Sequence, residues 1–246
     1  MFQRFNCVAD VGFLIDGSES ITEPRAGGVE HNWNLIKDLI LVLAKDLNIT
    51  EDGAHVAVGV FSSVATLDIK FSDFTDYASF EKEVIKLNHP RLRTDHLRAF
   101  DLAFHQMFNV STGMRSGVPK TLILLTDGQC LRDCNYNAFE AGDLSCAEFC
   151  SSNYCLNTYE NCDINEFARW GSLFRDQNIA TIGIGIGNSI YEKEITDFVG
   201  QSNYYYKKSF NQILTKRFRR SLLLCEGKLV TLIFLRKELL LYLQCP

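Results

Sequence analysis

Residues 11–20 constrain the fold of this chain most, because a run of apolar residues ends there abruptly in polar ones. The apolar run is VGFLI, and Asp16, Ser18 and Ser20 follow it at alternate positions. An aliphatic run bounded by glycine is typical of a strand covered on both faces, as in a parallel sheet. We therefore expect three oxygen-bearing side chains to emerge together at the carboxyl end of a buried strand. For this segment alone, a polar turn is the plainer interpretation.

Two later segments favour a shared site over a simple polar turn. Residues 121–128 (TLILLTDG) repeat the design, with Asp127 at the exit of a second buried strand. Between the two strands, Thr94 stands just before a segment with helical periodicity. Hydroxyl and carboxylate oxygens of low formal charge suit Mg²⁺ or Mn²⁺ and suit zinc or copper poorly. The order, spacing and strand contexts of these segments together favour a metal site over unrelated turns.

The same positions resemble the metal-ion-dependent adhesion site of a von Willebrand factor type A domain, the module also found as the inserted domain of integrins. The matching residues are Asp16, Ser18, Ser20, Thr94 and Asp127. The resemblance implies that Ser18 and Ser20 bind the cation directly, and that Thr94 binds it directly or through water. Asp16 and Asp127 would hold coordinated waters. A cation held in this way, Mg²⁺ or else Mn²⁺ or Ca²⁺, stays electrophilic enough to accept a carboxylate from a partner.

Alternating strands and helices predict an α/β fold. We expect strands near residues 8–15, 54–61, 65–71, 119–126, 179–186 and 203–207. We expect helices near residues 31–47, 75–87, 96–108, 163–177, 190–199 and 208–223. This order predicts a doubly wound, mainly parallel six-stranded sheet with helices on both faces. The connection at residues 62–63 is too short for a crossover, so the strand at 65–71 should be an antiparallel edge strand. The predicted domain spans residues 7–225.

Composition excludes several classes of protein. With 246 residues and 46% hydrophobic content, the chain can bury one large core and requires no second domain. A formal net charge of -5 argues against a general nucleic-acid binder. The apolar stretch at residues 229–235 is followed at once by RKE, so we expect no membrane span in this chain.

Nine cysteines in one chain need an explanation. Six of them crowd into an insertion at residues 129–162: Cys130, Cys134, Cys146, Cys150, Cys155 and Cys162. This crowding suggests three disulfides formed in an oxidising compartment, although six cysteines allow fifteen pairings. A zinc cluster is the rival interpretation, and the absence of any Cys-x-x-Cys pair or histidine from the insertion disfavours it.

Two further cysteines flank the domain. In the topology that the family implies, the first strand begins and the last helix ends at the pole opposite the metal. We therefore expect a Cys7–Cys225 disulfide, which the chain-entropy model values at about 5 kcal/mol before strain. Cys245 is left over in a Leu-rich tail at residues 226–246. That tail could be an amphipathic helix, the start of a neighbouring domain or mistranslated sequence.

The cysteines predict a secreted protein, and the resemblance implies a place in the extracellular matrix. Asn48 and Asn109 each open an Asn-x-Ser/Thr sequon, so they are candidate glycosylation sites, although such sequons often occur by chance. Residues 1–6 are too short and polar to form a secretory signal peptide. We therefore expect the chain to be a fragment or an incomplete gene model.

The resemblance predicts a cell-adhesion or matrix-binding module that clasps an acidic residue of an extracellular protein such as collagen. The alternative is a structural matrix-assembly module in which the cation only stabilises the fold. Catalysis is disfavoured, because Gly-x-Ser-x-Gly and His-Glu-x-x-His are absent and the five histidines show no partner motif. The glycines at 183, 185 and 187 lie within a predicted strand and lack the spacing of a phosphate-binding loop.

Overall fold

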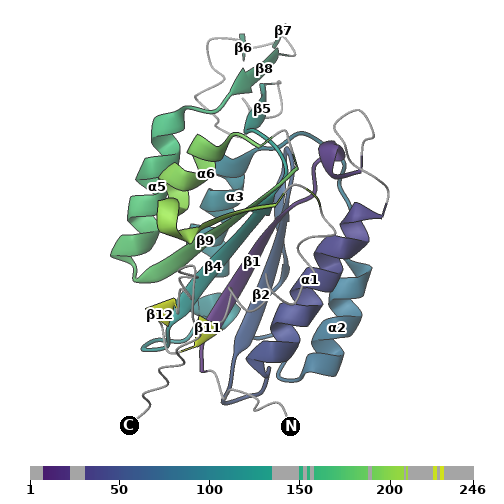
Figure 1. Cartoon of the computed structure of the whole chain (residues 1–246), viewed down its shortest axis with the longest axis vertical. Coiled ribbons are helices and arrows are strands. Elements are labelled where there is room, and N and C mark those ends of the chain that lie inside the picture. Colours follow the sequence, from purple (N-terminus) through teal and green to yellow (C-terminus); the bar gives the residue numbers. More distant parts are fainter. Residues whose placement is uncertain are drawn as a thin grey trace, which may run out of the picture.

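A computed structural model describes residues 8–22, 31–134, 150–151, 154–155, 158–187, 190–207, 209, 224–225 and 228–229. A six-stranded sheet with the order β10-β9-β4-β1-β2-β3 forms its centre (Figure 1). The strands are β1 (Asp10–Asp16), β2 (His55–Phe61), β3 (Ala65–Ile69), β4 (Lys120–Thr126), β9 (Ile179–Ile186) and β10 (Tyr204–Lys207). All neighbours pair in parallel except β2 and β3, which pair antiparallel. The expected sheet with one antiparallel edge strand is confirmed.

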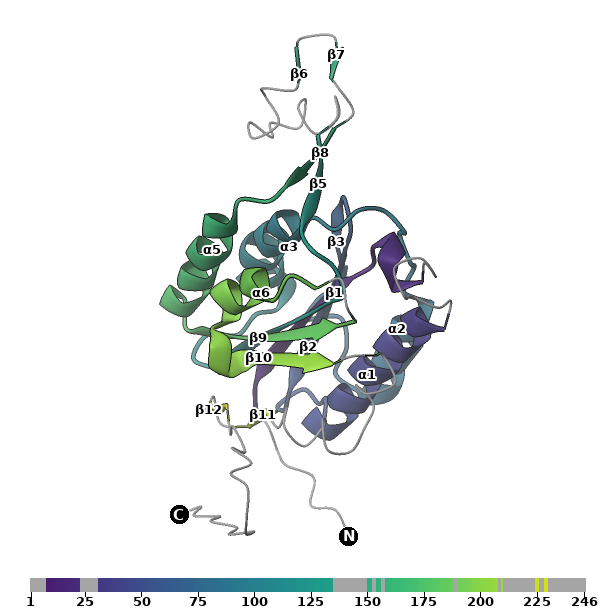
Figure 2. The same ribbon diagram turned by 45° about the horizontal axis from the view of Figure 1, so that its top comes forward.

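Helices cover both faces of this sheet. One face carries α1 (Asn32–Leu47) and α2 (Tyr77–Lys86), and the other carries α3 (His96–Leu102), α5 (Ile164–Asp176) and α6 (Glu192–Val199) (Figures 1 and 2). Short turns of other helical types complete the set: η1 (Glu19–Ile21), η3 (Ala103–Met107), η4 (Val110–Thr112) and η6 (Gln201–Asn203). The helix expected at 96–108 changes from α to π winding at η3, which apolar periodicity does not distinguish.

Strand β1 shows why the sheet is buried on both sides. Val11, Phe13 and Ile15 belong to the core cluster under α1 and α2, whereas Leu14 belongs to the cluster under α3, α5 and α6. Alternate side chains of a strand point to opposite faces, so an uninterrupted apolar run fills two cores. This double burial leaves the ends of β1 as the places where polar groups can lie.

The insertion begins and ends at one disulfide. Cys130 and Cys162 are bonded with their Cα atoms 5.5 Å apart, and they close a separation of 32 residues. Beyond them, β5 (Leu131–Cys134) pairs antiparallel with β8 (Thr158–Asn161), and β6 (Cys150–Ser151) pairs with β7 (Tyr154–Cys155). Both views show this ribbon projecting past the carboxyl ends of β1 and β4 (Figures 1 and 2).

Several sequence-based expectations lie outside the described residues. These are the Cys7–Cys225 disulfide, the helix at 208–223, Cys245, and the side chains of Cys134, Cys146, Cys150 and Cys155. A short pair of strands, β11 (Leu224–Cys225) with β12 (Lys228–Leu229), crosses the predicted start of the tail and was not anticipated. No helix in the described part of the chain combines the length and apolar character needed to cross a membrane.

A buried ion pair closes the amino end of β1, opposite the polar end. Asp10 is fully buried and accepts from the Arg115 backbone N–H at 2.7 Å and from Arg115 Nε at 2.8 Å. Arg115 Nη2 also donates to the carbonyls of Ala9 and Gly53 at 3.0 Å each. One guanidinium therefore joins the start of β1 to the loop that precedes β2.

We predict that Arg115→Met lowers the free energy of unfolding by about 3–5 kcal/mol, because it leaves the buried Asp10 carboxylate uncompensated. Urea denaturation of the single variants and the Asp10→Asn/Arg115→Met double variant measures this coupling. The double variant should lose less stability than the two single losses combined. Strictly additive losses would contradict the assignment of Arg115 as the partner that compensates Asp10.

Candidate metal centre

The candidate metal residues gather where the strand order of the sheet reverses. Strands β1 and β4 are hydrogen-bonded neighbours, yet the chain continues from β1 towards β2 and from β4 towards β9. Loops that leave neighbouring strands in opposite directions open a crevice at their carboxyl ends. Asp16 is the last residue of β1 and Asp127 directly follows β4, so both carboxylates lie at this crevice.

Hydrogen bonds tie these residues into one cluster. The Ser18 backbone N–H donates to Asp16 Oδ1 at 2.8 Å. The hydroxyl oxygens of Ser18 and Ser20 lie 3.0 Å apart, and Ser20 Oγ donates to Asp127 Oδ1 at 2.8 Å. The structure therefore brings Asp127 to Asp16 and the two serines, although Asp127 lies more than a hundred residues further along the chain.

Thr94 completes the set from a third segment. A Cβ atom built on Gly128 would lie 3.3 Å from Thr94 Oγ1 and 3.9 Å from Ser20 Oγ. The two hydroxyls therefore border the small space that the missing side chain of Gly128 leaves. Together with Asp16, Ser18 and Asp127, they form a cradle with oxygen donors only, which fits Mg²⁺ or Mn²⁺.

The electrostatics of this cradle also fit a cation. Asp16 is fully buried and Asp127 is 5% exposed. Burial, together with repulsion from Asp16, raises the pKa of Asp127 to about 8, although the Ser20 hydroxyl opposes the shift. Burial also raises the pKa of Asp16 against the hydrogen bonds from Ser18 and Thr126. Within the described ranges, no Lys or Arg side chain forms an ion pair with either carboxylate.

A neighbouring loop braces the serine-bearing segment. Arg91 N–H donates to the Gly17 carbonyl, and Glu19 N–H donates to the Leu92 carbonyl, each at 2.9 Å. His89 Nε2 lies 2.9 Å from the Ser18 carbonyl oxygen, and its ring stacks on Trp33 at a centroid distance of 4.8 Å. The backbone between β1 and η1 is therefore held at several points, which restricts the positions of the serine hydroxyls.

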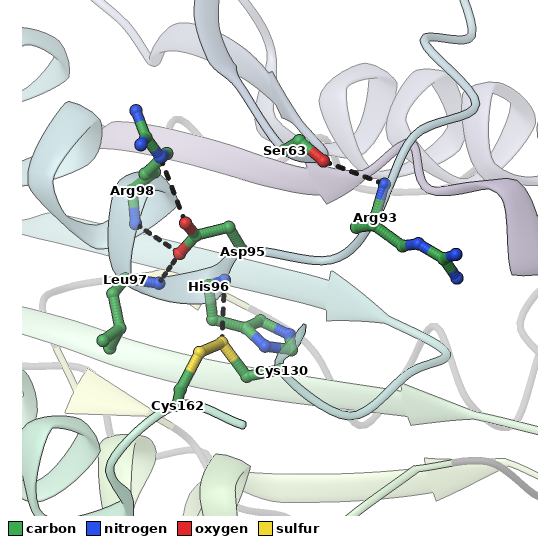
Figure 3. A network of polar contacts seen from close by, with 8 residues as sticks. All are labelled: Ser63, Arg93, Asp95, His96, Leu97, Arg98, Cys130 and Cys162. Atoms are coloured by element: carbon green, nitrogen blue, oxygen red, sulfur yellow. Dashed lines mark hydrogen bonds and ion pairs between the residues drawn. A yellow bond between two sulfur atoms is a disulfide. The ribbon is translucent and has the colours of Figure 1, made fainter. Parts of the chain in front are cut away.

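Asp95 fixes the segment that carries Thr94. Its Oδ1 accepts from the N–H groups of Leu97 and Arg98 at 3.1 Å each, and its Oδ2 accepts from Arg98 Nε at 3.1 Å (Figure 3). This is an N-cap of α3, a role that an aspartate directly before a helical segment predicts. We did not single out Asp95 from the sequence, although this signal was present.

The insertion is anchored directly to the candidate metal centre. Leu131 N–H donates to the Thr94 carbonyl at 2.7 Å, and Cys130 N–H donates to Glu194 Oε2 at 2.9 Å. Glu194 is buried, and this burial raises its pKa to about 7. Asp95 lies within 4.8 Å of the sulfurs of Cys130 and Cys162, but disulfide-bonded sulfurs do not bind a metal as thiolates (Figure 3).

Known proteins are similar to this chain in sequence. Matrilin-1 of Gallus gallus is 22% identical over 206 residues, which make up 83% of this chain and 34% of that protein. Cochlin of Cavia porcellus is 28% identical over 123 residues, which make up 50% of this chain and 21% of that protein. The chain thus spans about a third or less of these relatives.

Solved structures share the fold. Proximal thread matrix protein 1 from the mussel byssus, solved with a zinc-occupied metal-ion-dependent adhesion site, aligns with a TM-score of 0.66 at 21% identity. The alignment covers 87% of this chain and 44% of the mussel chain. Manganese-loaded TRAP protein of Plasmodium vivax aligns with a TM-score of 0.58 at 17% identity, covering 87% of this chain and 74% of that one.

The family model of the von Willebrand factor type A domain matches residues 10–219. This match contains all six strands of the central sheet and the three segments that carry the candidate metal residues. It confirms the resemblance that the oxygen-bearing residues at the strand ends predicted. The chain belongs to the von Willebrand factor type A domain family.

Proposed function

We propose that this domain is an extracellular matrix module that binds a partner protein through a divalent cation, with the partner supplying a carboxylate. The observation that carries the proposal is the convergence of three hydroxyl side chains on two buried carboxylates that no described cationic side chain neutralises. Mg²⁺ is the cation we favour, with Mn²⁺ or Ca²⁺ as the other candidates.

The residues divide the work by their chemistry. Ser18, Ser20 and Thr94 offer neutral hydroxyl oxygens, so they bind a cation without cancelling its charge. Asp16 and Asp127 would supply negative charge beside them and would hold waters of the cation. A bound cation would supply a Lewis-acidic position for the carboxylate of a partner.

Similarity to matrilin-1 and cochlin supports placement in the extracellular matrix. A partner such as collagen, or another matrix protein that presents an acidic residue, fits this chemistry. The Cys130–Cys162 disulfide is consistent with secretion, because disulfides persist in oxidising compartments. The competing proposal is a structural assembly module in which the cation stabilises the fold without contacting a partner. Both proposals are non-enzymatic.

The first test removes one carboxylate. We predict that Asp127→Ala abolishes Mg²⁺ binding in titration calorimetry, because the cradle loses charge and the acceptor that orients the Ser20 hydroxyl. The matched control is Asp101→Ala, which removes a carboxylate that is 60% exposed on α3. The control should bind Mg²⁺ as the wild type does. Unchanged affinity in Asp127→Ala would refute the metal assignment.

We also predict that stability without metal falls as the pH rises. The folded pKa of Asp127 lies above its ordinary value, at about 8 instead of 3.8, so folding favours the protonated form. This contribution is complete below pH 3.8 and is lost as the pH rises through about 8. In chelator, the Tm of the wild type should therefore fall over this range relative to that of Asp127→Asn, and Mg²⁺ should remove the difference.

Calorimetric scans of both proteins across this pH range measure the effect. Using Asp127→Asn as the reference cancels contributions from the other acids and bases of the chain. Melting curves of the two proteins that shift in parallel with pH in chelator would contradict the proposed repulsion between Asp16 and Asp127.

The insertion offers a route to partner selection. Residues 129–162 carry five acids and one arginine, and they leave directly from the metal centre. The insertion would then form an acidic rim beside the metal residues. This rim should repel partners with a broadly acidic surface and favour a partner that presents a single carboxylate among basic or neutral residues. The competing interpretation is that these acids only keep an exposed ribbon soluble.

We predict that replacing residues 131–161 by a short Gly-Ser linker, with Cys130 and Cys162 retained, preserves Mg²⁺ affinity and changes partner affinity or choice. Keeping the disulfide leaves the root of the insertion closed, so the variant separates the rim from its anchor. Binding of matrix proteins to the wild type and to the shortened domain is compared on the same array. Identical binding profiles would show that the insertion does not select partners.

A further inference from the structure

His96, the first residue of α3, lies behind the metal centre and outside the ligand set. Its ring is fully buried and contacts three aromatic rings, with centroid distances of 5.3 Å to Phe61, 6.2 Å to Phe100 and 5.7 Å to Phe167. Its Nε2 lies 3.0 Å from Thr126 Oγ1. Its Nδ1 is buried and has no hydrogen-bond partner among the described residues. Full burial among aromatic rings favours the neutral form of the ring.

The direction of the hydrogen bonds follows from counting protons. Thr126 Oγ1 donates to Asp16 Oδ2 at 2.6 Å, and a hydroxyl has one proton to donate. The single hydroxyl proton of Thr126 therefore points to Asp16. The contact between His96 and Thr126 then needs a donor on the ring, which places the histidine proton on Nε2. In this tautomer Nδ1 carries no proton, so no N–H group of the ring is left without an acceptor.

We propose that His96 is a positioning residue of the metal centre, whose Nε2–H donates to Thr126 Oγ1 and so directs the Thr126 hydroxyl onto Asp16. The inference rests on the proposed function, in which Asp16 belongs to the metal centre, and it adds a residue to that site. We call the two hydrogen bonds from His96 through Thr126 to Asp16 the relay. Asp16 Oδ1 accepts from the Ser18 N–H, and the relay holds the other carboxylate oxygen, Oδ2. Groups that orient ligands in this way tune the affinity of a metal site.

A purely structural role explains these contacts less well. The pocket around the ring is aromatic, and phenylalanine would fill it without burying a nitrogen that lacks a partner. An unsatisfied buried acceptor costs free energy. Its presence indicates that the position uses the donor on the opposite side of the ring. The His96 backbone N–H also lies 3.3 Å from Cys130 Sγ, so the root of the insertion holds the relay in place (Figure 3).

The first experiment reads the tautomer directly, with no metal present. Long-range ¹H–¹⁵N NMR spectra of the wild-type chain in chelator should show the ring proton of His96 on Nε2. In Thr126→Val the acceptor is lost, and the Nε2–H form should no longer dominate. A proton on Nδ1 in the wild type, or an unchanged tautomer in Thr126→Val, would overturn the proposal.

The second experiment measures Mg²⁺ affinity in a matched pair of variants. His96→Phe keeps an aromatic ring and removes the donor, and His96→Gln keeps an N–H donor at similar reach. We expect His96→Phe to weaken Mg²⁺ binding about tenfold, the lower end of the effect of groups that orient metal ligands. His96→Gln should recover most of the loss. Equal affinity in both variants and the wild type would overturn the relay.

A second pair keeps the proposal testable if His96→Phe does not fold. Thr126→Ser retains the hydroxyl and should bind Mg²⁺ as the wild type does, whereas Thr126→Val should bind more weakly. Equal binding by these two variants would also overturn the relay. A wild type that bound no Mg²⁺ would instead refute the proposed function, and the NMR result in chelator would still decide the role of His96.

Discussion

Repulsion between two buried carboxylates organises this molecule. Strands β1 and β4 are hydrogen-bonded neighbours along almost their whole length, so their ends cannot separate. Asp16 and Asp127 are therefore held close together in a site where water screens their charges poorly. Only a proton or a cation relieves this repulsion, and the serine and threonine hydroxyls beside the pair supply the oxygens that a hard cation needs.

The architecture around the pair separates stability from function. The Asp10–Arg115 ion pair closes the amino end of β1, while the carboxyl end of the same strand carries Asp16. Two apolar cores lie between these ends and contain the buried apolar side chains of the described residues. Because most residues of those cores lie outside the metal loops, the polar end of the sheet can carry groups that destabilise the protein when no cation is bound.

The insertion is part of this polar end. Its first strand starts from a hydrogen bond to the Thr94 carbonyl, and the Cys130 N–H contacts the buried Glu194 of α6. The segment that carries Thr94 is thus in direct contact with the root of the ribbon. A partner bound at the metal would also meet the base of the ribbon, which gives the proposed selection of partners a physical basis.

The sequence predicted the sheet and the gathering of oxygen-bearing side chains at its strand ends because both leave local signals. The apolar run of β1, the short connection before β3 and the polar residues at the strand exits are all visible within a few positions. The Thr126–His96 contact, the Glu194 anchor and the Cys130–Cys162 pairing are not, since they join distant segments whose partners no periodicity specifies. The π turn at η3 was missed because a single π turn is too short to leave an apolar spacing of its own.

The central claim is that the cation forms part of the contact with a partner. The most direct measurement is a pull-down of extracellular matrix proteins by the wild-type domain in Mg²⁺, repeated in chelator at a temperature where circular dichroism shows the fold intact. The account predicts a partner that is retained in Mg²⁺ and released by chelator. A partner that stays bound in chelator, with the domain still folded, would contradict the claim and favour a cation that only stabilises the fold.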